Sequence, residues 1–195
     1  GNTNIVLGCL ENRKIRAVAR MAPDVNKTDY EYAVGMKNVL AFAGFQPESF
    51  EGAILSNVVW PLTSTLCRAV KLLTGLDTLV VGKGLKTGLD IRLDDPGQIG
   101  ADLVVGAVAA LHLHRPPLIV IDMGTATTIS AVDAQGRFAG GAIVPGLRLS
   151  MESLSGYTSQ LPRVSLDAPA KCIGTNTVPA CSPARSTARL PCSTG

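Results

Sequence analysis

The chain has 195 residues, 46% of them apolar, so it is long enough and apolar enough to bury a core. Its formal net charge is +3, and its basic residues do not interleave with aromatic residues in a stripe, which argues against a nucleic-acid partner. The longest apolar run, Leu103–Leu111, is too short to span a bilayer, and the sequence shows no signal-peptide pattern, so we expect no membrane partner.

Alternating strand and helix patterns indicate an α/β protein. The patterns predict strands over 5–10, 15–21, 52–59, 78–81, 118–121, 128–133 and 138–144, and helices over 27–43, 62–73 and 103–114. The first two strands read as a hairpin, and Thr28 or Asp29 is expected to cap the first helix, which Gly44 ends. We expect the helix over 103–114 to be buried, because it is apolar on nearly all sides.

The five cysteines favour a reducing compartment. They are odd in number and lack the CxxC spacing that is typical of zinc and redox sites. We therefore expect free thiols in a cytoplasmic protein, at Cys9, Cys67, Cys172, Cys181 and Cys192.

Asp102 falls in the opening turn of the helix over 103–114. A glycine-rich segment, 83–96, of a kind typical of functional loops, lies a few residues upstream. The Asp102 carboxylate has two possible roles. It stabilises the positive end of the helix, or it acts as a general base at the mouth of a cleft.

The segment 118–146 carries the most chemistry. It begins with an apolar run that predicts a buried strand ending at Asp122, and a turn of small residues, 123–127, follows. Gly124 lets the backbone approach a ligand, and Thr125 adds a hydroxyl group. Oxygen atoms that can bind a cation would lie beside N–H and O–H groups that can donate hydrogen bonds to an anion. This combination suits a polyphosphate with its metal. The alternative is a surface hairpin in which Asp122 caps its own turn.

An internal duplication is also indicated. Gly1 and Gly124 lie 123 positions apart, and the same offset places the hairpin turn Asn12–Arg13 on Gln135–Gly136. One glycine turn and one hairpin at matched spacing predict two copies of one structural unit.

The motifs come in the order Gly1–Asn4, Gly100–Asp102, Ile121–Thr127, Gly140–Gly146, Leu161–Pro162 and Ile173–Thr177. This ordered set closely resembles the type III pantothenate kinases. The resemblance implies a duplicated ribonuclease-H-like (actin-like ATPase) α/β fold, with a nucleotide cleft between domains over 1–114 and 115–178, the second incomplete. Residues 179–195 match nothing in the family, and we expect a disordered or non-native tail there.

The resemblance implies ATP-dependent phosphorylation of pantothenate to 4′-phosphopantothenate, the first step of coenzyme A biosynthesis. The family works as a cytoplasmic homodimer with Mg²⁺ and a monovalent cation, K⁺ or NH₄⁺. Relative to the family, the chain is expected to be truncated at both ends, with activity lower by at least about a hundredfold. The alternatives are a non-catalytic nucleotide-binding or transcription accessory protein, and a phosphatase, on the same fold.

The family's roles carry over to matching residues. Asp102 resembles the proton acceptor, and Asp122 resembles the ligand of the monovalent cation. The substrate contacts are Gly100, Ala101, Asp102, Leu103 and Thr177. The contacts to ATP are Gly1, Asn2, Thr3, Asn4, Ile5, Val6, Gly124 and Thr125. Two positions depart from the family, which usually has Arg where Leu103 stands and often has Tyr where Leu93 stands.

Overall fold

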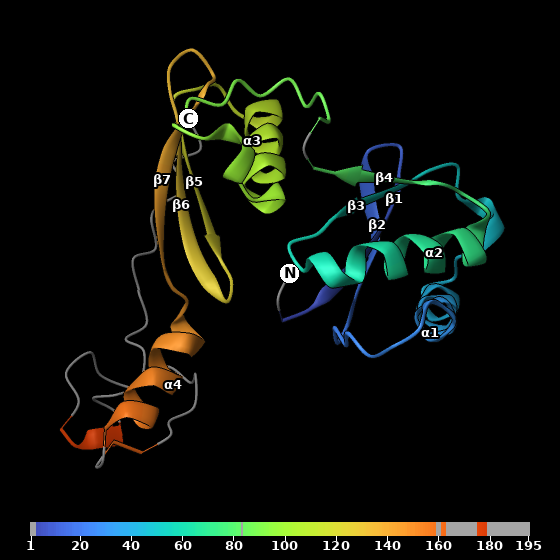
Figure 1. The fold of residues 1–195 in the computed structure, drawn as a ribbon, viewed down its shortest axis with the longest axis horizontal. Helices are drawn as coiled ribbons and strands as arrows, with labels where there is room; N and C mark the ends of the chain where they lie inside the picture. The colour runs from blue at the N-terminus through green and yellow to red at the C-terminus, as the bar shows by residue number, and fades with distance from the viewer. Residues whose placement is uncertain (1–2, 83, 159–160, 163–174, 179–195) are drawn as a thin grey trace. The chain divides into compact units, whose positions relative to one another are not determined.

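The structure is a computed structural model that describes residues 3–82, 84–158, 161–162 and 175–178. It is a mixed α/β protein (Figure 1), as the sequence predicts. The strands are β1 (Ile5–Glu11), β2 (Lys14–Met21), β3 (Ala53–Ser56), β4 (Thr78–Val81), β5 (Leu118–Met123), β6 (Ala126–Val132) and β7 (Phe138–Pro145). The α-helices are α1 (Asp29–Phe42), α2 (Thr63–Thr74), α3 (Ala101–Leu113) and α4 (Leu147–Tyr157).

The chain divides into two compact units. Unit 1 comprises residues 1–120 and 130–140, and unit 2 comprises residues 121–129 and 141–195. Strands β5, β6 and β7 form one sheet in that order. Within the described residues, no helix is both long enough and apolar enough to cross a bilayer.

Strands β1 and β2 form the predicted antiparallel hairpin, with Ile5 opposite Met21. Its turn places two consecutive non-glycine residues in the left-handed region, Asn12 at φ 52° and Arg13 at φ 61°. Positive φ at both central residues gives a twist that matches the flanking strands. Asparagine tolerates this conformation well, so the turn sequence itself explains the position of the hairpin.

Helix α1 begins where its local sequence predicts. Thr28 is the N-cap, and its hydroxyl accepts from the N–H of Glu31 at 3.3 Å. The Glu31 carboxylate in turn accepts from the N–H of Thr28 at 2.8 Å, which completes a capping box. The Thr28 N–H and the Thr28 hydroxyl, which donates to the same carboxylate at 2.9 Å, hold the pKa of the Glu31 carboxyl below its usual value. Gly44, at φ +80°, follows the end of the helix, as predicted.

One core of unit 1 lies between helices and strands. Helices α1 and α2 pack together and against strands β1, β2 and β3, and Tyr32 is fully buried among them. Strands β3 and β4 pair in parallel, so their carboxyl ends lie at the same edge. The buried members of the cluster are Tyr32, Ala33, Met36, Leu62, Leu66 and Ala69.

A second core of unit 1 forms around α3. Ala107 of α3 is buried with Val132 and Phe138, and partly buried side chains from 89–99 pack against them. The segment predicted as a loop is therefore held in place. Its Arg92 N–H donates to the carbonyl of Phe138 at 2.8 Å, and the Phe138 N–H donates to the carbonyl of Asp90 at 2.8 Å.

Two burial predictions are wrong. Helix α3 is not buried on all sides, because Leu113 is 73% exposed. Strand β5 is not a buried strand, because the side chains of Ile119 and Ile121 are 71% and 59% exposed. An apolar run gives the strand, but burial depends on what packs against each face, which the run itself does not specify.

The bounds around the central turn also differ from the prediction. Strand β5 continues through Met123, and β6 begins at Ala126 rather than at 128. Asp122 therefore lies within β5, and the turn is reduced to Gly124–Thr125. Helix α4 was not predicted at all. The stretch expected as a tail, 179–195, lies outside the described residues.

Candidate functional site

The turn between β5 and β6 is built by backbone contacts within unit 2. The Gly124 N–H donates to the carbonyl of Ala126 at 3.0 Å, and the Gly146 N–H donates to the carbonyl of Thr125 at 2.9 Å. Gly124 and Thr125 are both exposed. Two of the predicted ATP contacts thus lie together in one accessible turn, to which a second glycine, Gly146 at the start of α4, is hydrogen-bonded.

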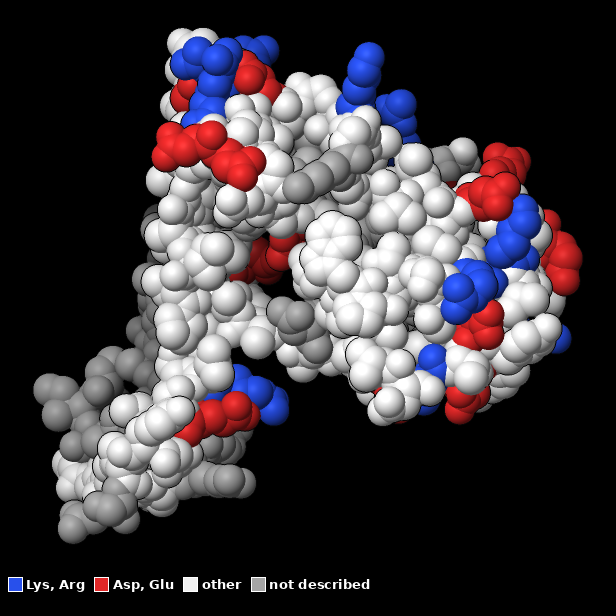
Figure 2. Space-filling view, viewed as in Figure 1, with Lys and Arg blue, Asp and Glu red and all other residues white. Residues whose placement is uncertain are grey.

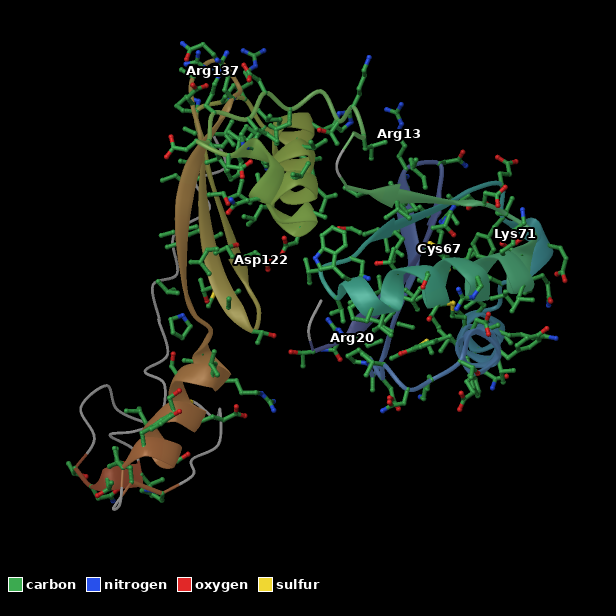
Figure 3. All side chains as sticks on the ribbon, viewed as in Figure 1. Arg13, Arg20, Cys67, Lys71, Asp122 and Arg137 are labelled. Carbon is green, nitrogen blue, oxygen red and sulfur yellow. The ribbon has the colours of Figure 1, made fainter. Side chains whose placement is uncertain are left out.

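Asp122 is exposed on β5, two residues before this turn (Figure 3). Within the described residues, no hydrogen bond joins its carboxylate to the turn that follows, so the alternative in which Asp122 caps its own turn is wrong. The carboxylate therefore remains accessible to a cation.

Asp102 lies in the first turn of α3 in unit 1, and its side chain is exposed. Its Oδ1 accepts from the N–H of Leu103 at 3.0 Å. The same oxygen occupies the space beside Gly100, where an added β-carbon would overlap it. Gly100 is the N-cap of α3 and has no side chain to cap the helix. The carboxylate thus lies over the backbone of Gly100, at the N-terminal end of the helix.

A hollow of about 770 Å³ in unit 1 opens beside the start of α3. Gly100 and Ala101 line it, together with Asn57 after β3 and Gly82 after β4. Ligands in α/β proteins commonly bind beyond the carboxyl ends of parallel strands, and β3 and β4 end here. Two of the predicted substrate contacts therefore face a common cavity. Asp102 and Leu103 are not among the lining residues.

The lining includes residues that sequence reasoning missed, Trp60 and Gln98. The side-chain amide of Asn57 is used locally, because Nδ2 donates to the Val59 carbonyl at 2.8 Å and to Thr63 Oγ1 at 2.9 Å. Asn57 therefore shapes the wall of the hollow. The only sequence indication for Trp60 was its position after a strand, as the chain's single tryptophan.

The other predicted contacts to ATP and pantothenate come from the two ends of the sequence. Thr3 and Asn4 are exposed before β1, Ile5 packs toward the first core, and Val6 is exposed on the opposite face of β1. Thr177 is exposed in the short described segment 175–178. Gly1 and Asn2 lie outside the described residues. Residues 3–6 and 100–103 belong to unit 1, whereas Asp122, Gly124, Thr125 and Thr177 belong to unit 2.

A charged pair with a lowered carboxyl pKa lies in another turn of the chain. In the turn between β6 and β7, Asp133 Oδ1 accepts from the Arg137 N–H at 2.9 Å, and Oδ2 accepts from Arg137 Nε at 2.7 Å. These contacts hold the pKa of Asp133 below its usual value. On the visible face in Figure 2, Lys and Arg side chains mostly neighbour Asp and Glu side chains, which agrees with the low net charge.

Among the described residues, no group of three or more His, Cys, Asp or Glu side chains is placed to hold a metal ion. Mg²⁺ commonly binds through one or two carboxylates together with substrate phosphates and water. Asp122 offers a single exposed carboxylate next to the Gly124–Thr125 turn.

The sequence model of the type III pantothenate kinases matches residues 1–183. The chain belongs to this family. The matched range includes Asp102, Asp122 and the two glycine-containing segments at Gly1 and Gly124. The family assignment accounts for their order along the chain.

Solved structures that are similar to this family member include the following one. It comes from Campylobacter jejuni and is described as a conserved protein assigned to the Baf family of transcriptional activators. The two chains are 22% identical, with a TM-score of 0.45, and the match covers 74% of this chain. The chain spans 61% of the length of that protein.

Proposed function

We propose that the chain transfers the γ-phosphoryl group of ATP to the hydroxyl group of pantothenate, the first step of coenzyme A biosynthesis. The family match over residues 1–183 is the observation that carries the proposal. Kinases of this kind act mainly by positioning their substrates and neutralising phosphate charge. The exposed Gly124–Thr125 turn and the exposed Asp102 are the two chemical parts that such a reaction needs.

Asp102 is proposed as the general base. As the pantothenate hydroxyl oxygen attacks the γ-phosphorus, its proton passes to the Asp102 carboxylate, and the bond to the β-phosphate oxygen breaks to release ADP. The hollow beside Gly100 and Ala101 would hold pantothenate, since its walls are mostly apolar with a few polar groups. Leu103 would contribute an apolar contact where the family usually has a cation.

The Gly124–Thr125 turn is proposed to bind the phosphates through backbone N–H groups and the Thr125 hydroxyl. Residues 1–6 would form the matching loop of a duplicated ribonuclease-H-like fold with domains over 1–114 and 115–178. Asp122 would hold K⁺ or NH₄⁺. Mg²⁺ bound by phosphate oxygens would neutralise charge on the triphosphate. Thr177 would contact pantothenate, and the working form would be a cytoplasmic homodimer.

Asp102→Asn tests the proposal. It keeps the size of the side chain and removes the proton acceptor, so we expect formation of 4′-phosphopantothenate to fall by about 10²- to 10⁴-fold while ATP binding is unchanged. Product is measured by mass spectrometry and ATP affinity by calorimetry. Asp94→Asn is the control, because it removes an exposed carboxylate just upstream of Gly100.

A parent chain that binds ATP or pantothenate without forming product would favour the non-catalytic alternative. If Asp102→Asn and Asp94→Asn both retained the parent's turnover, the assignment of the base would be wrong. Phosphate released from ATP only when pantothenate is absent would instead indicate hydrolysis by water.

A further inference from the structure

Gly146 does not need to be glycine because of its own backbone conformation. Its φ of −67° and ψ of 164° are accessible to any amino acid. This distinguishes it from Gly44 and Gly75, whose φ values of 80° and 75° favour glycine. The requirement at position 146 must therefore come from its surroundings.

The surroundings leave no room for a side chain. A β-carbon on Gly146 would overlap the carbonyl oxygens of both Gly124 and Thr125, and it would lie 2.8 Å from the Thr125 carbonyl carbon. These are backbone atoms, so no flexible side chain can move away to relieve the contact. The same close approach lets the Gly146 N–H donate to the Thr125 carbonyl at 2.9 Å.

Gly146 also begins α4. It is the N-cap of the helix, and its carbonyl accepts from the Ser150 N–H at 2.9 Å. One residue thus bonds to the turn through its N–H and to the first turn of α4 through its carbonyl. The orientation of the Thr125–Ala126 peptide is consequently tied to a helix that lies more than twenty positions later in the sequence.

We infer that Gly146 is a positioning residue that holds the Gly124–Thr125 turn in the conformation needed to bind the phosphates of a nucleotide. The inference rests on the proposed function, because that function places ATP at this turn. Gly146 need not touch the nucleotide. Its contribution is to fix the Thr125 carbonyl, so that the neighbouring N–H groups stay directed at the ligand.

Gly146→Ala tests the inference, with Gly156→Ala as the matched control in the same helix. A β-carbon at Gly156 would meet nothing within 4 Å. We expect Gly146→Ala to weaken ATP binding by at least about tenfold, the loss of roughly one hydrogen bond. Pantothenate affinity and thermal unfolding should stay within about twofold and a few degrees of the parent. Gly156→Ala should change neither ligand affinity.

A second readout does not depend on activity. Backbone amide exchange over 124–127 should be faster in Gly146→Ala than in the parent and in Gly156→Ala. The reason is that the turn has lost the hydrogen bond from the N–H of residue 146 to the Thr125 carbonyl. Equal exchange in all three proteins together with equal ATP affinity would overturn the inference. The inference would also be overturned if Gly146→Ala lowered the affinities for ATP and pantothenate equally and lowered the unfolding temperature as well. That result would indicate a general structural role for Gly146.

A third measurement uses the unsubstituted chain. A scalar coupling through the hydrogen bond between the Gly146 amide nitrogen and the Thr125 carbonyl carbon is expected by NMR, and its absence would overturn the inference even if the variant failed to fold. A parent chain that bound no ATP would refute the proposed function. In that case the coupling and the exchange rates would still decide whether Gly146 holds the turn.

Discussion

The carboxylate of Asp102 fills the space that a β-carbon would occupy on Gly100. Gly100→Ala should therefore displace the carboxylate that the proposed function uses as a base. We expect turnover to fall by about a hundredfold, since a shift of about 1 Å at a reacting group has effects of that size. Phosphopantothenate formation measures this.

Gly106→Ala is the control for that experiment. It lies in the same helix, and its β-carbon would meet only Val120 Cγ1 at an ordinary 3.9 Å. Turnover should be retained, and the helix should gain up to about 1 kcal/mol from the better helix former. Equal losses in both variants would show that the helix, not the carboxylate, responds to substitution.

Tyr32→Phe should destabilise unit 1. The Tyr32 side chain is fully buried, and its hydroxyl donates to the Asp24 carbonyl at 2.8 Å while accepting from the Asp24 N–H at 2.8 Å. Removing the hydroxyl leaves both Asp24 groups unpaired, so we expect a loss of about 1–3 kcal/mol in the free energy of unfolding. Urea unfolding measures it. Tyr30→Phe, at a side chain that is 68% exposed, should have no effect.

The Asp133–Arg137 contacts predict a pH dependence of stability. The Arg137 N–H and guanidinium lower the pKa of Asp133 in the folded chain below its ordinary 3.8. The unfolded chain therefore takes up the proton first as pH falls, so the stabilisation is full above pH 3.8 and is lost as pH falls through the lower, folded pKa. The unfolding temperatures of the parent and Asp133→Asn should differ at pH 7 and converge in strong acid. A difference that is constant with pH would contradict this.

Two thiols should differ in reactivity. Cys9 is 4% exposed, and burial raises the pKa of its thiol, so little reactive thiolate is available. Cys67 on α2 is only partly buried. Brief treatment with iodoacetamide at pH 8 should modify Cys67 well before Cys9, as peptide mass spectrometry would show. Similar rates in the folded chain, as in a denatured control, would count against the buried position of Cys9.

Features set by neighbouring residues were predictable from the sequence. The β1–β2 turn at Asn12–Arg13 and the Thr28 cap of α1 form from groups within a few positions of one another. The place of Asp102 in the first turn of α3 follows in the same way. Of the candidate site, the sequence could predict the residue types and their order along the chain.

Features set by distant residues were not predictable. Asp90 and Arg92 are held by backbone hydrogen bonds to Phe138, and the need for glycine at 146 comes from carbonyl groups at 124 and 125. The exposed apolar face of β5 is a further case, because an apolar run does not show which neighbours will cover it. Helix α4 was missed because the predicted unit ends at Gly146, which is in fact the N-cap of the helix.

Strand β2 alternates so that Lys14, Arg16 and Arg20 lie on the same exposed face as Val18. Arg16 is paired with Glu11, while Arg20 extends from the other end of the strand (Figure 3). A second molecule that packed on this face would bring the positive charges of the two molecules together. The resulting repulsion disfavours association through the exposed apolar side chains of β2. Dissolved salt screens such repulsion. Molecules that stay apart in dilute buffer would thus begin to adhere through this hairpin as ionic strength rises.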